Sequence, residues 1–385
     1  MSSSISILFA GDFAPCRRFE SLVLQKKNEI FGNLQKDITE ADFSFLNLET
    51  PLCIYNNPIE KTGPSLKAHP DCIQAVKSAG FDVVGLANNH IMDFDKEGLE
   101  ETILSCKSAD LNICGAGKNL EEAQNITIVE SRGLKIAYIA VAEHEFSIAD
   151  TDKAGAAPLD PVDNTLQIES VRNQVDLVFV SIHGGNEYFS LPRPGLRKLC
   201  RYYITRGADA VICHHPHVAG AYEIYKDKPI VYSLGNLIFD HSTPPEGWNE
   251  GYAVSLEYTI EDKKLSKFNV IPYTQSVEQG GLCKMSGSVK NVFLKKIEYY
   301  NNILGNEDLY IETWNEFCQK EKNTLLLKNY LPVHFRGMRR VGKIINPKFL
   351  FLPSQKNRHV KLNLIRCESH LELLRSVLSE EDVDG

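Results

Sequence analysis

Three histidines stand within four residues directly after an apolar run. The run ends at Cys213, and the imidazoles that follow it are His214, His215 and His217. We expect the run to be a short buried strand. The end of such a strand is held rigidly, so that His215 and His217 can reach one point. Neutral imidazole is the commonest metal ligand, so the cluster indicates metal binding. The alternative is a polar turn with hydrogen-bonded histidines, and ligands elsewhere in the chain decide between the two.

Ligand-type side chains also end four earlier apolar runs. They are Asp12; Asn47 and Glu49; Asn88, Asn89 and His90; and His183. Singly, several have simpler explanations: Asp12 is typical of a turn, the Asn47 segment of a helix cap or loop, and His183 of a core histidine. In layered α/β folds, ligands gather at the carboxyl ends of the strands, so these groups should converge. Histidine, carboxylate and Asn oxygen suit Mn²⁺, Fe²⁺ or Zn²⁺. There are enough ligands for two ions about 3.5–4 Å apart, the arrangement that serves phosphoester hydrolysis.

Helical segments alternate with the apolar runs. Helices are expected over about 19–39, 70–80, 98–109 and 195–206, and strands over 5–10, 42–46, 81–87, 134–142, 175–182 and 210–213. Pro70 suits a first helical position and Gly80 a helix end. The alternation indicates βαβ units and a layered α/β fold. After Lys228, strands without intervening helices are expected over 229–234, 252–260 and 267–273, the last two as a hairpin, and from about Val289 the pattern is helical.

The composition is that of a soluble globular protein. The chain has 385 residues, 43% hydrophobic and 24% charged, which allows one large α/β domain with an appendage or two ordinary domains. A formal net charge of -8 argues against general nucleic-acid binding. Ten scattered cysteines without a C-x-x-C pair and without a signal peptide favour reduced thiols in the cytoplasm. The apolar segments are too short to cross a bilayer, so we expect a soluble protein, at most held at a membrane surface.

Residues 325–361 differ from the rest of the chain in charge. They carry nine Lys or Arg and no Asp or Glu, interleaved with Leu, Phe and Ile. Such a segment could dock on an anionic membrane, where each basic residue contributes about 1 kcal/mol. The simpler interpretation is a solvated helical cap on an acidic domain.

The motifs, in their order along the chain, resemble the CapA family of bacterial capsule and poly-γ-glutamate synthesis proteins, a branch of the calcineurin-like metallophosphoesterases. They are Gly11-Asp12, 47–52, 87–90, 183–188, 214–218 and 232–240. The resemblance covers about residues 5–275 and implies a four-layer α/β/β/α sandwich with a dinuclear site at one edge. We therefore predict a metallophosphoesterase-type domain over 1–280 and a mostly helical, basic extension over 281–385.

The resemblance also implies roles for the site residues. Asp12 and His217 would bind the first metal ion, Asn89, His183 and His215 would bind the second, and Glu49 would bridge them. His90 would protonate the leaving group, a role that suits histidine because the ordinary pKa of an imidazole is about 6.5. Residues expected to support the ligands or to contact substrate are Asn47, Asn88, Glu187, His214, Asn236 and Asp240.

Two positions depart from the family pattern. The wider superfamily has a histidine where this chain has Ala14, as is expected for the CapA branch, so the first metal lacks one imidazole. The branch often has Trp where this chain has Gly184, which alters the wall of the pocket.

The function expected from these observations is a dinuclear metal-dependent hydrolase in the biosynthesis of capsule, poly-γ-glutamate or a related polysaccharide. Its substrate would be a small or polymeric anion such as a phosphoester, and no specific nucleic-acid partner is expected. The alternative is a non-catalytic accessory protein that binds an anionic polymer or a membrane surface through its basic segment. The sequence makes no prediction of the oligomeric state.

Overall fold

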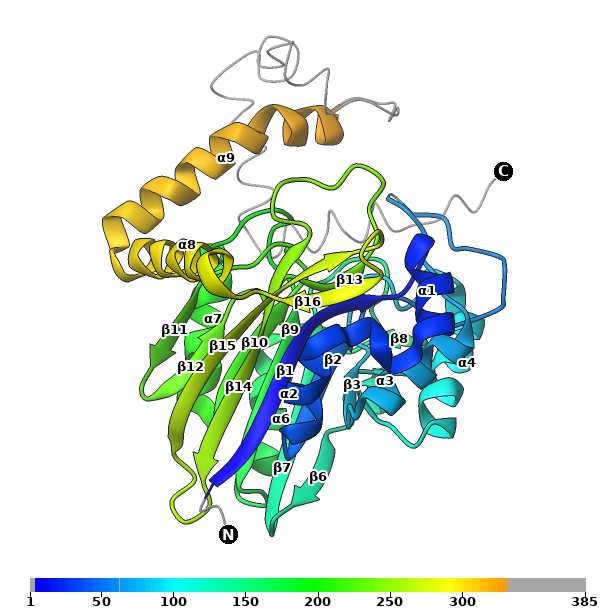
Figure 1. Ribbon diagram of the computed structural model, residues 1–385, viewed down its shortest axis with the longest axis horizontal. Coiled ribbons are helices and arrows are strands. Elements are labelled where there is room, and N and C mark those ends of the chain that lie inside the picture. Colours follow the sequence, from blue (N-terminus) through cyan, green and yellow to red (C-terminus); the bar gives the residue numbers. More distant parts are fainter. Residues whose placement is uncertain (1–3, 62, 331–385) are drawn as a thin grey trace. The chain divides into compact units, whose positions relative to one another are not determined.

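The chain forms two large β-sheets that lie face to face, with helices on their outer faces (Figure 1). The computed structural model describes residues 4–61 and 63–330, with side chains up to residue 321. The expected strands and helices are present, with the exceptions given below. The sequence did not predict the helix Pro161–Arg172 or the strands Asn112–Cys114, Thr127–Ser131 and Tyr222–Tyr225.

The first sheet has the order β16-β15-β14-β1-β2-β3-β4, with β13 also paired to β1. Its strands are β1 (Ser4–Ala14), β2 (Phe43–Leu48), β3 (Val83–Gly85), β4 (Asn112–Cys114), β13 (Asn236–Phe239), β14 (Glu250–Thr259), β15 (Leu265–Ser276) and β16 (Gly281–Lys284). Strands β1 to β4 and β13 run parallel, whereas β14 and β15 form the expected antiparallel hairpin.

The second sheet has the order β11-β12-β10-β9-β7-β6. Its strands are β6 (Thr127–Ser131), β7 (Leu134–Ala142), β9 (Leu177–His183), β10 (Ala210–His214), β11 (Tyr222–Tyr225) and β12 (Lys228–Val231). The four central strands are parallel, as the alternation of strands and helices predicts. A small separate sheet pairs β5 (Ala116–Gly117) with β8 (Gly155–Ala156).

Several helices begin or end at recognisable signals. They are α1 (Arg18–Lys26), η1 (Lys27–Leu34), α2 (Gln35–Glu40), η2 (Pro70–Cys72), α3 (Ile73–Ala79), α4 (Asp95–Ser108), α5 (Leu120–Ala123), α6 (Pro161–Arg172), α7 (Pro194–Arg206), α8 (Gly287–Gly305) and α9 (Glu307–Tyr330). Gly80 and Gly207 end α3 and α7 in the left-handed conformation, which costs glycine least. Asp160 caps α6 by accepting hydrogen bonds from two backbone N–H groups.

Aromatic side chains fill the space between the two sheets. Phe9 of β1 packs edge-on against Phe179 of β9 with 5.3 Å between ring centroids, and Phe45 of β2 stacks on Tyr138 of β7 at 5.9 Å. On the outer faces, Phe13 of β1 stacks on Phe31 of η1, and α6 and α7 share a second core with the other sheet. The order of layers is therefore helices, sheet, sheet, helices, which confirms the predicted α/β/β/α arrangement.

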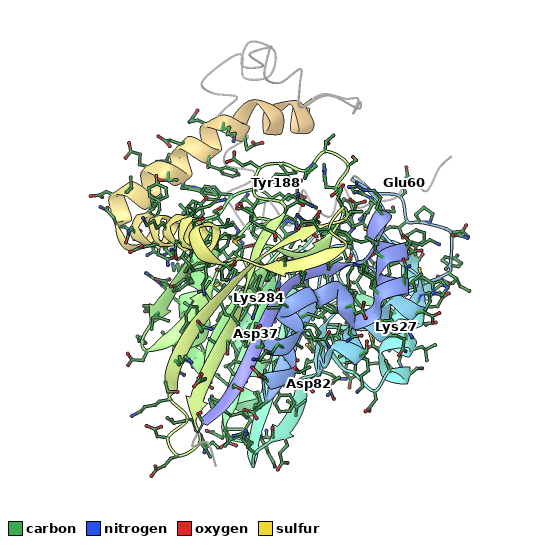
Figure 2. All side chains as sticks on the ribbon, in the orientation of Figure 1. Lys27, Asp37, Glu60, Asp82, Tyr188 and Lys284 are labelled. Carbon is green, nitrogen blue, oxygen red and sulfur yellow. The ribbon has the colours of Figure 1, made fainter. Side chains whose placement is uncertain are left out.

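The helix expected over 19–39 is divided into three pieces. Gly32 lies at a left-handed φ of 51° inside η1. A Cβ at this position would stand 2.0 Å from the carbonyl oxygen of Leu282, so the close approach of β16 requires glycine here. An ion pair of 2.5 Å between Lys284 and Asp37 also joins β16 to α2, the next piece of the divided helix (Figure 2).

The strand expected over 229–234 is shorter in the structure and is followed by a crossing to the other sheet. Strand β12 ends at Val231 in the second sheet, and the chain then crosses to the first sheet as β13 from Asn236. Gly235, at a φ of 72°, makes the crossing, and its carbonyl accepts a hydrogen bond from Asp12 N–H. The crossing brings Asn236 into register beside Asp12.

The chain divides into two compact units, Met1–Tyr310 and Ile311–Gly385. Helix α8 belongs to the first unit, where Phe293 and Ile297 join the large core. The predicted domain boundary at residue 280 stays a prediction. The basic segment over 325–361 lies outside the residues whose side chains are described. Within the described part of the chain, no helix has the length and apolar character needed to cross a membrane.

Candidate metal centre

The candidate ligands lie at the same end of the two sheets. In the first sheet, the strand registers pair Asp12 with Asn47 of β2 and with Asn236 of β13. In the second sheet, His214 of β10 pairs with His183 of β9. Hydrogen bonds and close contacts described below join the two rows, so the convergence that the strand ends predict is present.

A β-bulge in β1 turns Asp12 toward the second sheet. Phe9 points between the sheets, and regular alternation would direct a residue three positions later to the opposite face. The register shifts between Phe9 and Asp12, and the Asp12 carboxylate consequently faces the histidine loop. Its Oδ2 accepts a hydrogen bond of 3.1 Å from His215 N–H, and its Oδ1 lies 3.1 Å from His214 Nδ1.

Glu49 is the feature that most directly indicates a bound cation. Its side chain is fully buried, and neither carboxylate oxygen has a hydrogen-bond partner among the described residues. Oε1 lies 3.6 Å from Nε2 of His183 and 3.6 Å from Nε2 of His217. Burial, followed by the negative charge of Asp12, holds the pKa of Glu49 well above its usual range. Because a buried carboxylate is stable when ionised only with a partner, these residues fit a divalent ion.

Two groups of three residues bring their ligand atoms within 4.8 Å of one another, and Glu49 belongs to both. They are Asp12, Glu49 and His183, and Glu49, His215 and His217. Nε2 of His183 also lies 3.1 Å from Oδ1 of Asn89 and 3.1 Å from Nδ1 of His215. The structure thus brings all six predicted ligands together. The predicted division of these ligands between two ions stays a prediction.

The charge state of the centre suits metal binding at neutral pH. Burial, with a further effect of His215, lowers the pKa of His183 well below its usual range, and burial lowers the pKa of His217 to about 4. Both imidazoles are therefore neutral and keep a lone pair. Burial by itself raises the pKa of Asp12, but contacts with His214 and with other nearby histidines bring it well below its usual range, so this carboxylate is ionised.

Asn236 fixes which nitrogen of His217 faces the centre. Its Nδ2 donates to the carbonyl oxygens of His217 and Trp248, so its Oδ1 remains as an acceptor. This Oδ1 lies 3.1 Å from Nδ1 of His217, which must therefore carry the proton. The lone pair is left on Nε2, the atom that faces Glu49.

The backbone of the histidine loop is strained. His215 and His217 have φ values of 97° and 61°, which non-glycine residues rarely adopt. Such residues cost about 1–3 kcal/mol each and gather at functional sites. The hydrogen bond from Tyr188 N–H to the carbonyl of Pro216 helps to hold the loop. Figure 2 labels Tyr188 near this edge of the sheets.

His90 lies in a buried cluster that contains two residues not predicted from the sequence. Its Nδ1 stands 2.6 Å from Oδ2 of Asp93 and 3.2 Å from Nζ of Lys61. Lys61 and Asp93 also form an ion pair, and their side chains are 3% and 0% exposed. The spacing of three residues between His90 and Asp93 is a signal in the sequence, whereas Lys61 comes from a long loop and has none.

Three residues predicted to support the ligands or to contact substrate are buried: Asn47, Asn88 and His214. Asn47 donates to Asp12 Oδ1 at 2.8 Å and lies 3.2 Å from His183 Nδ1, so it touches two ligands. Asn88 holds the loop backbone by donating to the carbonyl of Leu48 and accepting from His90 N–H. His214 packs against Asp12 as described above.

Glu187 and Asp240 were also predicted to support the ligands or to contact substrate. Glu187 is exposed, and its charge contributes to raising the pKa of Glu49. Asp240 accepts hydrogen bonds from the side chain and backbone of Arg18, with the shortest ion-pair distance at 2.5 Å. Asp240 is thus positioned to anchor the start of α1.

The sequence also did not indicate the aromatic wall beside His217. Trp248 is 3% exposed, and its ring centroid lies 5.0 Å from that of His217, while Phe239 contacts both rings at 5.1 Å. Trp248 Nε1–H donates to the carbonyl of Phe239. This wall keeps one side of the centre apolar.

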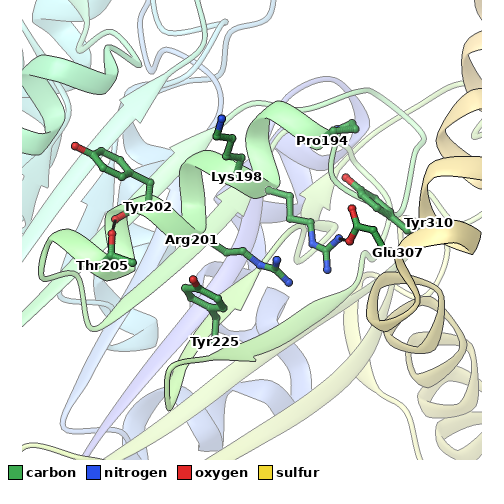
Figure 3. Close-up of a pocket in the computed structure, with 9 residues that line it drawn as sticks. Pro194, Lys198, Arg201, Tyr202, Thr205, Tyr225, Glu307 and Tyr310 are labelled. Carbon is green, nitrogen blue, oxygen red and sulfur yellow. Dashed lines mark hydrogen bonds and ion pairs between the residues drawn. The ribbon is translucent and has the colours of Figure 1, made fainter.

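A separate pocket of about 450 Å³ lies on α7 (Figure 3). Its residues are Pro194, Arg197, Lys198, Arg201, Tyr202, Thr205, Tyr225, Glu307 and Tyr310. Arg197 pairs with Glu307 at 2.8 Å, and Arg201 pairs with Glu223 at 2.6 Å. Because both guanidinium groups are already neutralised and no predicted ligand lines this pocket, the metal centre remains the candidate active site.

Comparison with known proteins connects the chain to capsule synthesis. The family model described as "Bacterial capsule synthesis protein PGA_cap" matches residues 6–241. The chain is 29% identical to "Capsule biosynthesis protein CapA" of Bacillus anthracis over 70% of this chain and 67% of that protein. It is 30% identical to "PGA biosynthesis protein CapA" of Bacillus subtilis over 70% and 71%. A solved structure of a phosphatase from Mycoplasma pneumoniae is similar with a TM-score of 0.46 and 16% identity, over 71% of this chain and 95% of that chain.

Proposed function

Because the chain belongs to the family of bacterial capsule synthesis proteins described as PGA_cap, we propose that it is a metal-dependent hydrolase in the synthesis of an anionic capsule polymer. Its substrate is a phosphoester or a similar anionic group. The observation that carries this proposal is the fully buried carboxylate of Glu49, which has no hydrogen-bond partner among the described residues and faces His183 and His217. A cation at this point would satisfy it.

The proposed centre is dinuclear. The residues that would hold Mn²⁺, Fe²⁺ or Zn²⁺ are Asp12, Glu49, Asn89, His183, His215 and His217. Two such ions would supply a water of lowered pKa and would stabilise negative charge on the substrate. The protein presents neutral imidazoles for this purpose, because burial lowers the pKa values of His183 and His217.

His90 is the proposed proton donor to the leaving oxygen. Asp93 contacts Nδ1 of His90 at 2.6 Å and so fixes the orientation of the ring. The other ring nitrogen, Nε2, is then the atom that can hold and deliver a proton. Lys61 balances the charge of Asp93 inside the cluster. His90 thereby keeps its orientation without an uncompensated carboxylate beside it.

The proposal predicts that the double variant His215→Ala/His217→Ala loses hydrolysis of a generic phosphodiester or monoester. We expect the rate of the Mn²⁺-loaded protein to fall at least about 100-fold, because electrostatic stabilisation by the ions is removed. A matched control is His69→Asn, which replaces a half-exposed histidine and retains a side chain able to cap η2. Full activity in the double variant would contradict the proposal.

A second candidate function is binding through the basic segment over 325–361, whose charge is the observation that favours it. Here the protein would contact an anionic membrane, and catalysis would not be required. Replacing Arg339 and Arg340 by Gln should weaken sedimentation with phosphatidylserine vesicles about 30-fold, at about 1 kcal/mol per charge near the surface. Equal sedimentation of the altered and unaltered proteins would rule this function out, as would absence of sedimentation in both.

A further inference from the structure

The segment that follows β7 places a third carboxylate beside the metal centre. Glu145 is partly exposed, and its Oε1 accepts a hydrogen bond of 3.3 Å from Nδ2 of Asn89. The same oxygen lies 3.9 Å from Nε2 of His215. One carboxylate oxygen thus faces two of the proposed ligands.

Both contacts are made by atoms of Asn89 and His215 other than the atoms that face His183. Asn89 directs its Oδ1 toward Nε2 of His183 at 3.1 Å, and its Nδ2 toward Glu145. His215 directs its Nδ1 toward the same nitrogen of His183 at 3.1 Å, and its Nε2 toward Glu145. Glu145 is also outside both groups of converging ligand atoms found among the described residues. Glu145 therefore contacts two of the proposed ligands without belonging to either group.

We propose that Glu145 is a positioning residue of the metal centre, which orients Asn89 and His215 so that their ligand atoms face the ion. The inference rests on the proposed metal-dependent function. An ionised carboxylate only accepts hydrogen bonds, so it selects the amide orientation of Asn89 with nitrogen outward and oxygen inward. In the same way it favours the tautomer of His215 that carries the proton on Nε2 and leaves the lone pair on Nδ1.

The backbone of the same segment supports this role. Ser147 Oγ–H donates to the carbonyl of Asn89 at 2.7 Å and accepts from Met92 N–H at 3.4 Å. Residues 145–147 therefore hold Asn89 at two points, its side chain through Glu145 and its backbone through Ser147. Only the contact with Glu145 affects the direction in which Oδ1 of Asn89 points.

The test is Mn²⁺ binding to the full chain, measured by calorimetry for affinity and stoichiometry. Glu145→Gln should lower the affinity for one of the two ions by about 10–100-fold, the usual effect of removing a partner that orients a ligand. The affinity for the other ion should stay within about threefold of that of the unaltered protein. The matched control is Glu143→Gln, which removes the same charge two residues earlier from a carboxylate paired with Arg193 at 2.7 Å. This control should bind both ions within about threefold of the unaltered protein. The visible spectrum of the Co²⁺-loaded protein should change in Glu145→Gln and stay unchanged in Glu143→Gln.

A double-mutant cycle with Asn89→Ala separates orientation from a general effect of charge. If Glu145 acts through Asn89, the loss caused by Glu145→Gln should be smaller when Asn89 is already absent. Unchanged affinity in Glu145→Gln, equal losses in the Gln variants of Glu143 and Glu145, or additive losses in the cycle would each overturn the proposal. An unaltered protein that binds no divalent ion would instead overturn the proposed function together with this inference.

Discussion

Glu49→Met is expected to abolish the stabilisation of the protein by divalent ions and to raise the melting temperature of the metal-free form. Without a cation, the Glu49 carboxyl is buried and has no hydrogen-bond partner among the described residues. Replacing such a group by an apolar side chain of similar volume is neutral or stabilising. With Mn²⁺ at 100 times its Kd, the unaltered protein should gain about 2.7 kcal/mol for each bound ion. The variant should gain nothing, because the ligand shared by both candidate groups is gone.

The pH dependence of the same variant provides an independent measurement. The pKa of Glu49 is raised in the folded protein, above its ordinary value of 4.5. Protonated Glu49 therefore stabilises the metal-free fold below pH 4.5, and this contribution is lost as the pH rises through the folded pKa. The free energy of unfolding of Glu49→Met should therefore exceed that of the unaltered protein by a margin that grows above pH 4.5, by up to about 1.4 kcal/mol per pH unit. Urea unfolding in a chelator measures it, and Glu130→Met on the exposed edge strand β6 is the control. A constant difference across this pH range would contradict the prediction.

Asp93→Asn is expected to destabilise the protein by about 3–5 kcal/mol, the usual cost of leaving a buried charge without its partner. The side chain of Lys61 is 3% exposed and pairs with Asp93, so the variant leaves an ammonium group in the interior. Asp93 Oδ2 also accepts a hydrogen bond of 2.7 Å from Leu66 N–H, which ties the long loop before α3 to the same carboxylate. The shift in the urea midpoint measures the effect.

The matched control is Asp110→Asn, which removes the exposed partner of Lys77 and should leave the urea midpoint unchanged. The double variant Lys61→Met/Asp93→Leu removes both charges and should recover part of the lost stability, because Leu66 N–H still lacks its acceptor. Its hydrolytic activity should stay low, because His90 no longer has Asp93 to orient it. A single Asp93→Asn variant as stable as the unaltered protein would show that the cluster is not held by this pair.

The sequence predicted that the candidate ligands converge, because each of them follows an apolar strand. Strand β7 covers 134–142 as expected, and β9 ends at the predicted ligand His183. Parallel strands in one sheet end at one edge, so the position of a polar residue after each strand already predicts that the side chains gather. The starts and ends of helices are also indicated by nearby residues, as Pro70 and Gly80 illustrate.

The sequence patterns did not predict contacts between segments that are distant in the chain. Asp240 was predicted to support the ligands or to contact substrate, and the sequence did not indicate that its carboxylate pairs with Arg18, 222 positions away in the chain. Lys61 lies in an irregular loop without periodicity, and only the folded loop brings it to Asp93 and His90. Trp248 likewise reaches His217 from another segment through the fold.

The sequence by itself determined which residues could bind metal, because residue type and strand-end position are local properties. The tertiary structure decided which way these residues face. The bulge before Asp12 reverses the alternation of side chains in β1, and the crossing at Gly235 sets Asn236 against His217. Both depend on how the two sheets pack and on where each backbone hydrogen bond finds its partner, which no window of sequence contains.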